Sequence, residues 1–352
     1  MAGRKTFRKV ITSEELIKQI NPKNTDLVER YLRNMSTKRS PKTIVVYRSN
    51  YNIFFVWNLL YNENKFITEI KKFELMDFFD FCVMDLKWKS NRFAQMHSSL
   101  SSLYTWIENT YDERYPNLRN IVMKIEKPPK ETTRKKSIFT KDELNSLLNW
   151  LGEIKKPQEQ CLLALMMGSG SRASELVRFT STHIDENSTA FEDLFLETTD
   201  DIKVKGRGVS GKMVKRYIIK DIFLPYYKMW LPIREKIMKE KKQEHDYIFI
   251  KPDGTPATEG TIRSWVEKWD KALNKHFYIH SVRHFWCTYL LSIGLEKELV
   301  QELQSWSSDT LVNIYNDSTA KDRKWKGLSK LKAELEKASF AEELDNIEKE
   351  MV

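Results

Sequence analysis

One short segment divides this sequence and limits what the chain can fold into. Residues 126–137, EKPPKETTRKKS, contain two prolines and five basic residues, and no apolar side chain other than the prolines. Such a segment cannot contribute to a hydrophobic core and favours an extended, charged linker. With 352 residues the chain is also too long for one small core. We therefore predict two domains, residues 13–125 before the linker and residues 138–320 after it.

The first domain is predicted to be helical. Ser40 and Pro41 open the run SPKTIVVYRSNYNIFFVWNLLY, Ser40 as the N-cap and Pro41 as the first helical residue. The earlier stretch TSEELIKQI combines a Thr/Ser cap with acids in its first turn, which is typical of a helix start. Further helices are expected over 69–86 and 91–110. Residues 1–12 form a basic extension before this domain.

The second domain is predicted to be mainly helical with a small β element. A helix capped by Thr140 opens it in FTKDELNSLLNWL. Residues 190–225 then mix β-branched and aromatic runs with a glycine-rich break, which indicates a β-hairpin. Helices are expected again over residues 226–242, 258–275, 280–293, 296–304 and 309–316, followed by a polar amphipathic tail over 321–352. The expected fold class is mainly α with a small β-hairpin or sheet (α+β).

Charge is distributed unevenly between these parts. Residues 1–137 hold 26 Lys and Arg against 15 Asp and Glu, a net of 26 − 15 = +11, whereas residues 138–320 hold 25 against 26 and residues 321–352 hold 8 against 8. A chain with a uniformly basic surface would also be basic in its other two parts. The pattern therefore indicates a nucleic-acid-binding module joined to a nearly neutral one. The basic side chains expected to contact DNA are Lys42, Arg48, Lys87, Lys89, Arg92, Arg134, Lys135 and Lys136.

Composition excludes several other classes of protein. The longest apolar run, CLLALMM, is far shorter than a membrane span, and the N-terminus lacks the apolar stretch of a secretion signal. Cys82, Cys161 and Cys287 lie far apart and form no metal-binding pair, which fits a reducing compartment. We expect a soluble cytoplasmic protein, associated with the nucleoid, that needs no metal and no cofactor.

Two short stretches contain candidate anion-binding residues. GSGSRASEL, 168–176, places Arg172 after a glycine–serine bend and Glu175 one turn later, an arrangement that suits a phosphate, although an arginine there could equally cap a helix C-terminus. HSVRHFWCTYLL, 280–291, puts two histidines and an arginine opposite an apolar stripe if it is helical. That polar face is either solvated or part of a site for an anion. The apolar stripe consists of Val282, Phe285, Trp286, Tyr289, Leu290 and Ile293.

A third stretch, QSWSSDTLVNIY, places Trp306 nine residues before Tyr315. Tyr315 shares a helix face with Leu311 and Val312, so a half-buried core tyrosine is the alternative interpretation. The near match to a phosphate-binding P-loop in GRGVSGKM is rejected, because Met213 stands where a hydroxyl is needed and a β-like segment follows.

Together these stretches resemble the tyrosine recombinases, or phage integrases. That family carries an arginine in a Gly-x-Arg-x-x-Glu context, a lysine on a β-hairpin, His-x-x-Arg, and a His or Trp nine residues before a nucleophilic tyrosine. The matching residues, in the same order, are Arg172, Lys205, His280, Arg283, Trp306 and Tyr315. The resemblance covers roughly residues 12–320. It implies a helical core-binding domain and a catalytic domain that close around DNA as a C-shaped clamp.

The resemblance also implies how these residues act. Tyr315 forms a 3′-phosphotyrosyl ester that a new 5′-hydroxyl later attacks, so that strands exchange without metal or ATP. Arg172 and Arg283 stabilise the charge that builds on the phosphate oxygens. The lysine protonates the leaving 5′-oxygen, His280 assists proton transfer, and Trp306 donates a hydrogen bond and buttresses Tyr315. The expected supporting residues are Glu175, His284 and Lys212.

The sequence departs from the family pattern in two places. The position that is most often Gly-His reads Ser305-Trp306. The hairpin is long, so Lys212 competes with Lys205 for the role of the catalytic lysine. Neither departure removes the tyrosine or either arginine.

The expected function is site-specific recombination, for integration or excision of a mobile element or prophage. The expected partners are double-stranded DNA with inverted core sites and three further copies of the chain, a tetramer on two sites. The tail, 321–352, is expected to couple neighbouring protomers. The resemblance also implies an accessory directionality protein as a further candidate partner. One alternative is a DNA-binding regulator that keeps the recombinase fold with little or no catalytic activity. Among enzymes, topoisomerase-like relaxation or the resolution of chromosome dimers would use the same residues.

Overall fold

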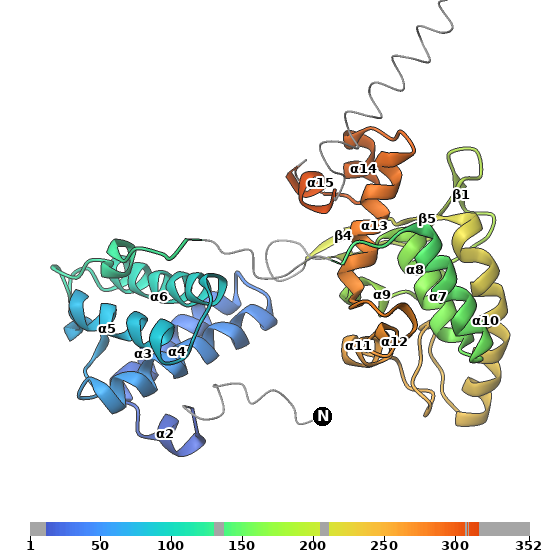
Figure 1. The fold of residues 1–352 in the computed structure, drawn as a ribbon. Helices are drawn as coiled ribbons and strands as arrows, with labels where there is room; N and C mark the ends of the chain where they lie inside the picture. Colours follow the sequence, from blue (N-terminus) through green and yellow to red (C-terminus); the bar gives the residue numbers. More distant parts are fainter. Residues whose placement is uncertain (1–11, 130–136, 205–210, 307, 309, 317–352) are drawn as a thin grey trace, which may run out of the picture. The chain divides into compact units, whose positions relative to one another are not determined.

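The computed structural model describes residues 12–129, 137–204, 211–306, 308 and 310–316. The chain divides into two compact units, a helical unit formed mainly by residues 1–135 and a second unit formed by residues 136–204 and 213–352 (Figure 1). Helices dominate both units, and the described strands all belong to short antiparallel sheets, so the predicted mainly α fold is confirmed. Within the part of the chain that the structure describes, no helix is long and apolar enough to cross a membrane. The predicted tail, 321–352, lies outside the described residues.

The helical unit is a bundle whose helices begin where capping residues permit. Ser40 accepts a hydrogen bond from the Thr43 N–H and Pro41 occupies the first helical position, as predicted. Asn21 caps the preceding helix in the same way. The elements are α2 (Glu14–Lys18), α3 (Pro22–Ser36), α4 (Pro41–Tyr61), η1 (Ile67–Glu69), α5 (Lys72–Met84), α6 (Ser90–Thr110) and η2 (Ile121–Lys124).

Aromatic side chains fill the core of the helical unit. Phe54 of α4 is fully buried and meets Phe78 of α5 edge to face, with ring centroids 4.9 Å apart. Polar side chains in this core are bonded to the backbone: Asn24 and Asn58 both donate to the carbonyl of Lys65. These bonds fix the loop between α4 and α5 on the bundle.

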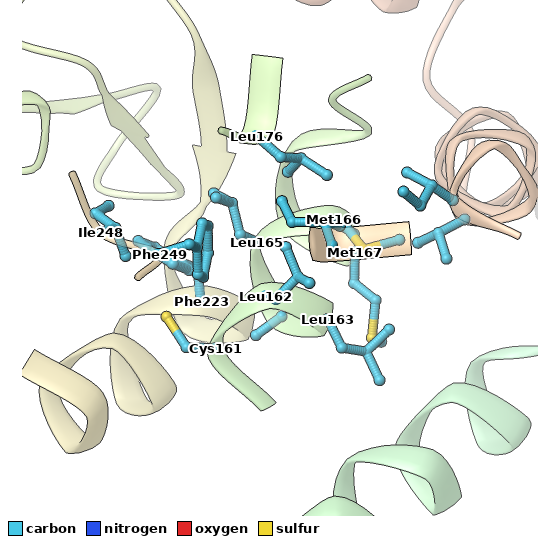
Figure 2. Packing of buried hydrophobic residues seen from close by; sticks show 14 of the residues in the cluster. Cys161, Leu162, Leu163, Leu165, Met166, Met167, Leu176, Phe223, Ile248 and Phe249 are labelled. Atoms are coloured by element: carbon cyan, nitrogen blue, oxygen red, sulfur yellow. The ribbon is translucent and has the colours of Figure 1, made fainter. Parts of the chain in front are cut away.

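The second unit is built around a helix that is buried on all sides. Helix α8 is buried from Glu159 to Ser169, contains the continuous apolar run 161–167, and packs against α7, α10 and α13. Figure 2 shows its side chains among those of Phe223, Ile248 and Phe249. The helices of this unit are α7 (Lys141–Glu153), α8 (Pro157–Ser169), α9 (Ala173–Leu176), η3 (Ser181–His183), α10 (Lys220–Lys241), α11 (Glu259–Val266), α12 (Asp270–Leu273), α13 (Ile279–Ser292), α14 (Lys297–Leu303) and α15 (Thr310–Tyr315).

The β region is more elaborate than the single predicted hairpin. One antiparallel sheet has the strand order β1–β2–β5, with Phe195 opposite Ile219, and a second contains β3 and β4. The strands are β1 (Thr189–Ala190), β2 (Phe195–Glu197), β3 (Ile202–Val204), β4 (Lys212–Val214) and β5 (Tyr217–Ile219). Strand β5 leads directly into α10 and also packs on α8, which anchors this region to the core.

Two of the helix predictions are wrong. Helix α10 begins at Lys220 instead of residue 226 and contains Pro225, because burial of Phe223 and Tyr227 in the core outweighs the local cost of a proline, about 3 kcal/mol. The predicted helix over 258–275 is two helices, α11 and α12. Asn274 ends the second of these in a left-handed conformation, with φ 47°.

Candidate active site

The turn after α8 presents the first candidate residue. Gly170 adopts a left-handed conformation with φ 58°, and a Cβ there would lie 2.8 Å from the Trp286 ring, so this turn requires glycine. The sharp turn places Arg172 at the N-cap of α9 with Glu175 in the first turn of that helix. The predicted bend, with Arg172 followed by Glu175 one turn later, is therefore present.

A buried carboxylate holds Arg172. Nη1 of Arg172 donates to Oε1 of Glu175 over 2.9 Å, and the Arg172 backbone N–H donates to Oε2 over 3.2 Å. Burial by itself would raise the pKa of Glu175, but the charges of Arg216, Arg172 and Arg283 hold that pKa below its usual value. The side chain of Arg172 keeps 19% of its surface exposed, whereas Arg216 and Arg283 are almost fully buried.

Sequence analysis missed a third arginine of this cluster. Arg216, just before β5, is almost fully buried; its Nη2 donates to Oε2 of Glu175 over 2.7 Å and its Nη1 donates to the Gln304 carbonyl over 3.1 Å. Burial lowers the pKa of Arg216, and the Glu175 carboxylate opposes that effect. Nothing in the local sequence KRY marks this arginine, because both of its partners lie far away along the chain.

Arg283 lies beneath two aromatic rings. Its guanidinium carbon is 4.9 Å from the centroid of the Trp306 ring and 5.0 Å from that of the Tyr315 ring, and its Nη1 donates to the Gly170 carbonyl over 2.6 Å. Among the described residues, neither Nε nor Nη2 of Arg283 finds a hydrogen-bond partner. Burial, and then the charge of Arg172, lowers the pKa of Arg283 to about 10, so it stays charged at neutral pH.

Of the two interpretations of the polar side of α13, the structure does not support a solvated face for Arg283 and His284, and the role in anion binding stays a prediction. Arg283 and His284 are buried together with Val282 and Trp286, because α13 packs on α8 on one side and on α14 and α15 on the other. Ile293, predicted on the apolar stripe, is instead 56% exposed just past the end of the helix. Helix α13 is therefore a central element with a charged group inside the fold.

Tyr315 ends α15 and lies at the centre of this cluster. Its ring is stacked on Trp306 with centroids 5.1 Å apart and contacts His284 at 4.9 Å. The His280 ring is 6.2 Å away. Thr288 of α13 donates to the Tyr315 carbonyl over 3.3 Å, which ties the end of α15 to α13. Only 8% of Tyr315 is exposed, so the side chain is more buried than the alternative interpretation expected. Its role as the nucleophile stays a prediction.

His280 is the candidate proton carrier of the site. Desolvation, followed by the charges of Arg283 and Arg172, lowers the pKa of His280 to about 4. The residue still presents much of its surface to solvent. Its imidazole is therefore neutral at pH 7, and an anion bound beside it would raise its pKa and make it a better proton acceptor.

The structure does not describe every predicted site residue. Lys205 lies outside the described residues, as do Arg134, Lys135 and Lys136. Lys212 is exposed at the start of β4, so the choice between the two lysines stays open.

The predicted DNA contacts of the helical unit differ in how they are held. Lys42, Lys87 and Lys89 are exposed. Arg48 pairs with Glu29. Arg92 stacks on the Trp88 ring at 4.4 Å and donates to Asn50 and Gln95, so its guanidinium is already engaged within the unit. Their contact with DNA stays a prediction.

The described cluster combines a phenol, a neutral imidazole and three guanidiniums around one carboxylate. Arginine donors in a water-poor site stabilise an oxyanion strongly, and a phenol is a competent nucleophile toward phosphorus. Among the described residues, no group of three or more His, Cys, Asp or Glu side chains is placed to hold a metal ion. The arrangement suits transfer of a phosphoryl group to a tyrosine.

Comparisons with known proteins agree with this geometry. The model of the phage integrase family matches residues 137–322. Tyrosine recombinase XerC of Oceanobacillus iheyensis is 25% identical over 308 residues, covering 84% of this chain and 91% of that protein. XerC of Psychromonas ingrahamii is 27% identical over 301 residues, covering 82% and 90%.

Solved structures share the fold. The Tn1549 transposon integrase in complex with a circular intermediate DNA aligns with a TM-score of 0.63 at 15% identity, over 88% of this chain and 99% of that one. A lambda integrase dimer bound to a COC′ core site aligns with a TM-score of 0.61 at 15% identity, over 84% and 96%. At this identity the likeness concerns the fold alone.

Proposed function

Because the chain belongs to the phage integrase family, we propose that it is a site-specific DNA recombinase that cuts and rejoins strands through a 3′-phosphotyrosyl intermediate. The observation that supports this best is the contact of Tyr315 with Arg283 and Trp306, next to an arginine held by Glu175. Phosphoryl transfer to a tyrosine requires such arginine donors beside the phenol, whereas binding of DNA alone does not require them.

In the proposed first step, the Tyr315 oxygen attacks the scissile phosphorus. The bond from phosphorus to the 5′-oxygen breaks, and an ester joins Tyr315 to the 3′ end of the cut strand. Neutral His280 accepts the phenol proton, directly or through water, and a lysine, Lys205 or Lys212, protonates the 5′-oxygen as it leaves. Attack of a 5′-hydroxyl from the partner strand then reverses the step and releases Tyr315.

The two arginines play unequal parts before DNA binds. Arg172 is partly exposed and can meet a phosphate at once. Arg283 lies under the Trp306 and Tyr315 rings, so a phosphate reaches its Nε and Nη2 donors only when these rings move aside. We infer that binding of the scissile phosphate displaces the segment that carries Tyr315 and so readies the nucleophile.

The assembly that we propose is a tetramer on two DNA sites, in the integration or excision of a mobile element. A lambda integrase tetramer bound to a Holliday junction has the same fold, with a TM-score of 0.60 at 17% identity. The net charge of +11 in residues 1–137 supports a DNA-clamping role for the helical unit. The tail, residues 321–352, is proposed to couple neighbouring protomers.

A trapped covalent adduct tests the reaction. A randomised duplex pool is first enriched for sequences that the wild-type chain retains, and a nicked duplex of the enriched sequence is then incubated with protein in EDTA. The wild-type chain should form an adduct that survives denaturing electrophoresis, and Tyr315→Phe should form none, because the phenol oxygen is the attacking atom. DNA retention should stay within about twofold, since phosphate contacts dominate affinity.

Tyr289→Phe on α13 is the matched control, because Tyr289 is a partly buried tyrosine of the same unit, stacked on Phe285. It should form the adduct at the wild-type level. An adduct that persists in Tyr315→Phe would remove Tyr315 from the role. Sequence-selective binding without any wild-type adduct would favour the regulator instead.

A further inference from the structure

Arg216 joins three segments that are distant in the sequence. Its guanidinium reaches Glu175, which lies 41 residues away in α9, and the carbonyl of Gln304, which lies 88 residues away before the Ser305–Trp306 turn. The arginine itself precedes β5, which packs on α8. We propose that Arg216 is a positioning residue for the recombination reaction, one that orients Arg172 through Glu175 and orients Trp306 through Gln304. This inference rests on the proposed function.

The first arm of the network acts on Arg172. Oε1 of Glu175 accepts from the Arg172 guanidinium, whereas Oε2 accepts from Arg216 and from the Arg172 backbone. Because Arg216 occupies Oε2, the Arg172 guanidinium makes one bond to the carboxylate and not two. Its remaining N–H groups are therefore available to a phosphate. Without Arg216, the buried carboxylate would draw the Arg172 guanidinium into a two-bond pairing and turn it away from the substrate.

The second arm acts on the turn that carries Trp306. The Gln304 carbonyl accepts from Arg216, and the Gln304 side-chain Nε2 donates to the Ser169 carbonyl over 2.5 Å. Gln304 thus links Arg216 to the loop that precedes Arg172. Ser305 follows in a left-handed conformation with φ 51°, which is unfavourable for a residue other than glycine and must be held by its surroundings. Two residues beyond Gln304, Trp306 stacks on Tyr315.

Arginine suits this position better than any other residue. Its planar fork places N–H groups in two directions at once, whereas a lysine ammonium is a compact donor on a flexible stem. Burying such a charge costs free energy, and a buried ion pair is weak evidence for a stabilising role. The groups that face Glu175 are Arg172, Arg216 and Arg283, with His280 further out. Because the Glu175 carboxylate lies among these cations, removal of the Arg216 charge should change the pH at which Glu175 takes up a proton.

The test compares Arg216→Met and Arg216→Lys with the wild-type chain and with Arg234→Met. Arg234 is a buried arginine of the same unit, on α10, whose guanidinium bonds to the carbonyls of Tyr247 and His245. Adduct formation is measured on the nicked duplex enriched from the random pool, with saturating DNA, across pH. Unfolding is measured in parallel by denaturant titration.

Arg216→Met should cut about 10- to 100-fold more slowly at saturating DNA, with DNA retention nearly unchanged, as expected for removal of a group that orients a site residue. Its activity should also fall off at a higher pH on the acid side, because loss of one cation lets Glu175 take up a proton more readily. Arg216→Lys should restore the pH profile and only part of the rate, because it restores the charge but not the bridge. Arg234→Met should cut at the wild-type rate per folded molecule.

Equal cutting rates and pH profiles for the wild-type chain and Arg216→Lys would overturn the bridging role. Wild-type behaviour of a folded Arg216→Met would overturn the whole inference. If Arg216→Met does not fold, Arg216→Lys alone decides, since it keeps the buried charge. Failure of the wild-type chain to form an adduct would instead contradict the proposed function, so the two failures are distinct.

Discussion

The two units treat their buried polar groups in opposite ways. In the described residues 12–129 of the helical unit, every buried side-chain nitrogen and oxygen finds a hydrogen-bond partner. Asn24 is an example: its amide donates to the Lys65 carbonyl over 2.9 Å and its oxygen accepts from the Ile67 N–H over 2.9 Å. In the second unit, Nε and Nη2 of Arg283 and Nε1 of Trp306 have no partner among the described residues.

A buried polar group that has a hydrogen-bond partner within the protein stabilises the fold, whereas one without such a partner is available to bind a ligand. A satisfied buried amide contributes modest stability, and its loss leaves backbone groups unpaired. A buried donor without a partner costs stability, and native proteins contain few of them. Three of those in the second unit, Nε and Nη2 of Arg283 and Nε1 of Trp306, belong to side chains that contact Tyr315, which supports their use in the proposed reaction. The comparison therefore predicts that mutations will affect stability in one unit and catalysis in the other.

The largest expected effect is on catalysis in the second unit. Arg283→Met should slow adduct formation by about 100- to 1,000-fold, because it removes donors to the phosphate oxygens. The free energy of unfolding should change by less than about 2 kcal/mol, since relief of a buried charge offsets the lost bond to Gly170. Denaturant titration and adduct kinetics measure the two quantities. A large loss of stability would show that Arg283 holds the fold.

A change of intermediate size is expected in the helical unit. Asn24→Ala should lower the free energy of unfolding of that unit by about 1–3 kcal/mol, because the Ile67 N–H and the Lys65 carbonyl both lose a partner. Asn34→Ala, at an exposed position on the same helix, is the control and should change it by less than about 0.5 kcal/mol. Adduct formation at saturating DNA should not change in either variant. Slower cutting by Asn24→Ala would break the proposed separation.

The smallest expected effect is on the pH dependence of stability, and it concerns one histidine in each unit. Burial lowers the pKa of His97 in the helical unit, with the charge of Lys127 adding to the effect, and the pKa of His280 is lowered to about 4. Each folded unit therefore binds fewer protons than its unfolded chain below the ordinary pKa of 6.5, so its stability should fall as pH drops below about 6.5, and in the second unit this fall should extend to about pH 4. His280→Gln and His97→Gln should each weaken this dependence for their own unit, as measured by denaturant titration at several pH values.

Bound DNA should change the protonation of His280 but not that of His97. A phosphate near His280 favours the protonated ring, so DNA affinity should rise a few-fold as pH drops from about 7 to about 5.5. This rise should be smaller in His280→Gln and unchanged in His97→Gln. An unchanged rise in His280→Gln would remove His280 from the phosphate site.

Prediction from the sequence succeeded where the signal was local. Ser40 and Thr140 cap the helices that they were expected to cap, and Thr140 does so in a reciprocal capping box with Glu143. The Arg172–Glu175 pair also lies within one helical turn. The prediction of α10 failed at Pro225, where a local breaker was outweighed by burial of distant core residues. The small β element was predicted, but the pairing of β2 with β5 was not, because these strands are about 20 residues apart in the chain.

The sequence by itself determined the helical character of both units, the excess positive charge of the first third, and the order and spacing of the residues from Arg172 to Tyr315. Only the tertiary structure decided that Arg283 is buried under Tyr315 and that Arg216 bridges Glu175 and Gln304. The physical reason is range: caps and periodicity depend on neighbours within a turn or two, whereas the burial and pairing of a charge depend on segments that meet only when the chain folds.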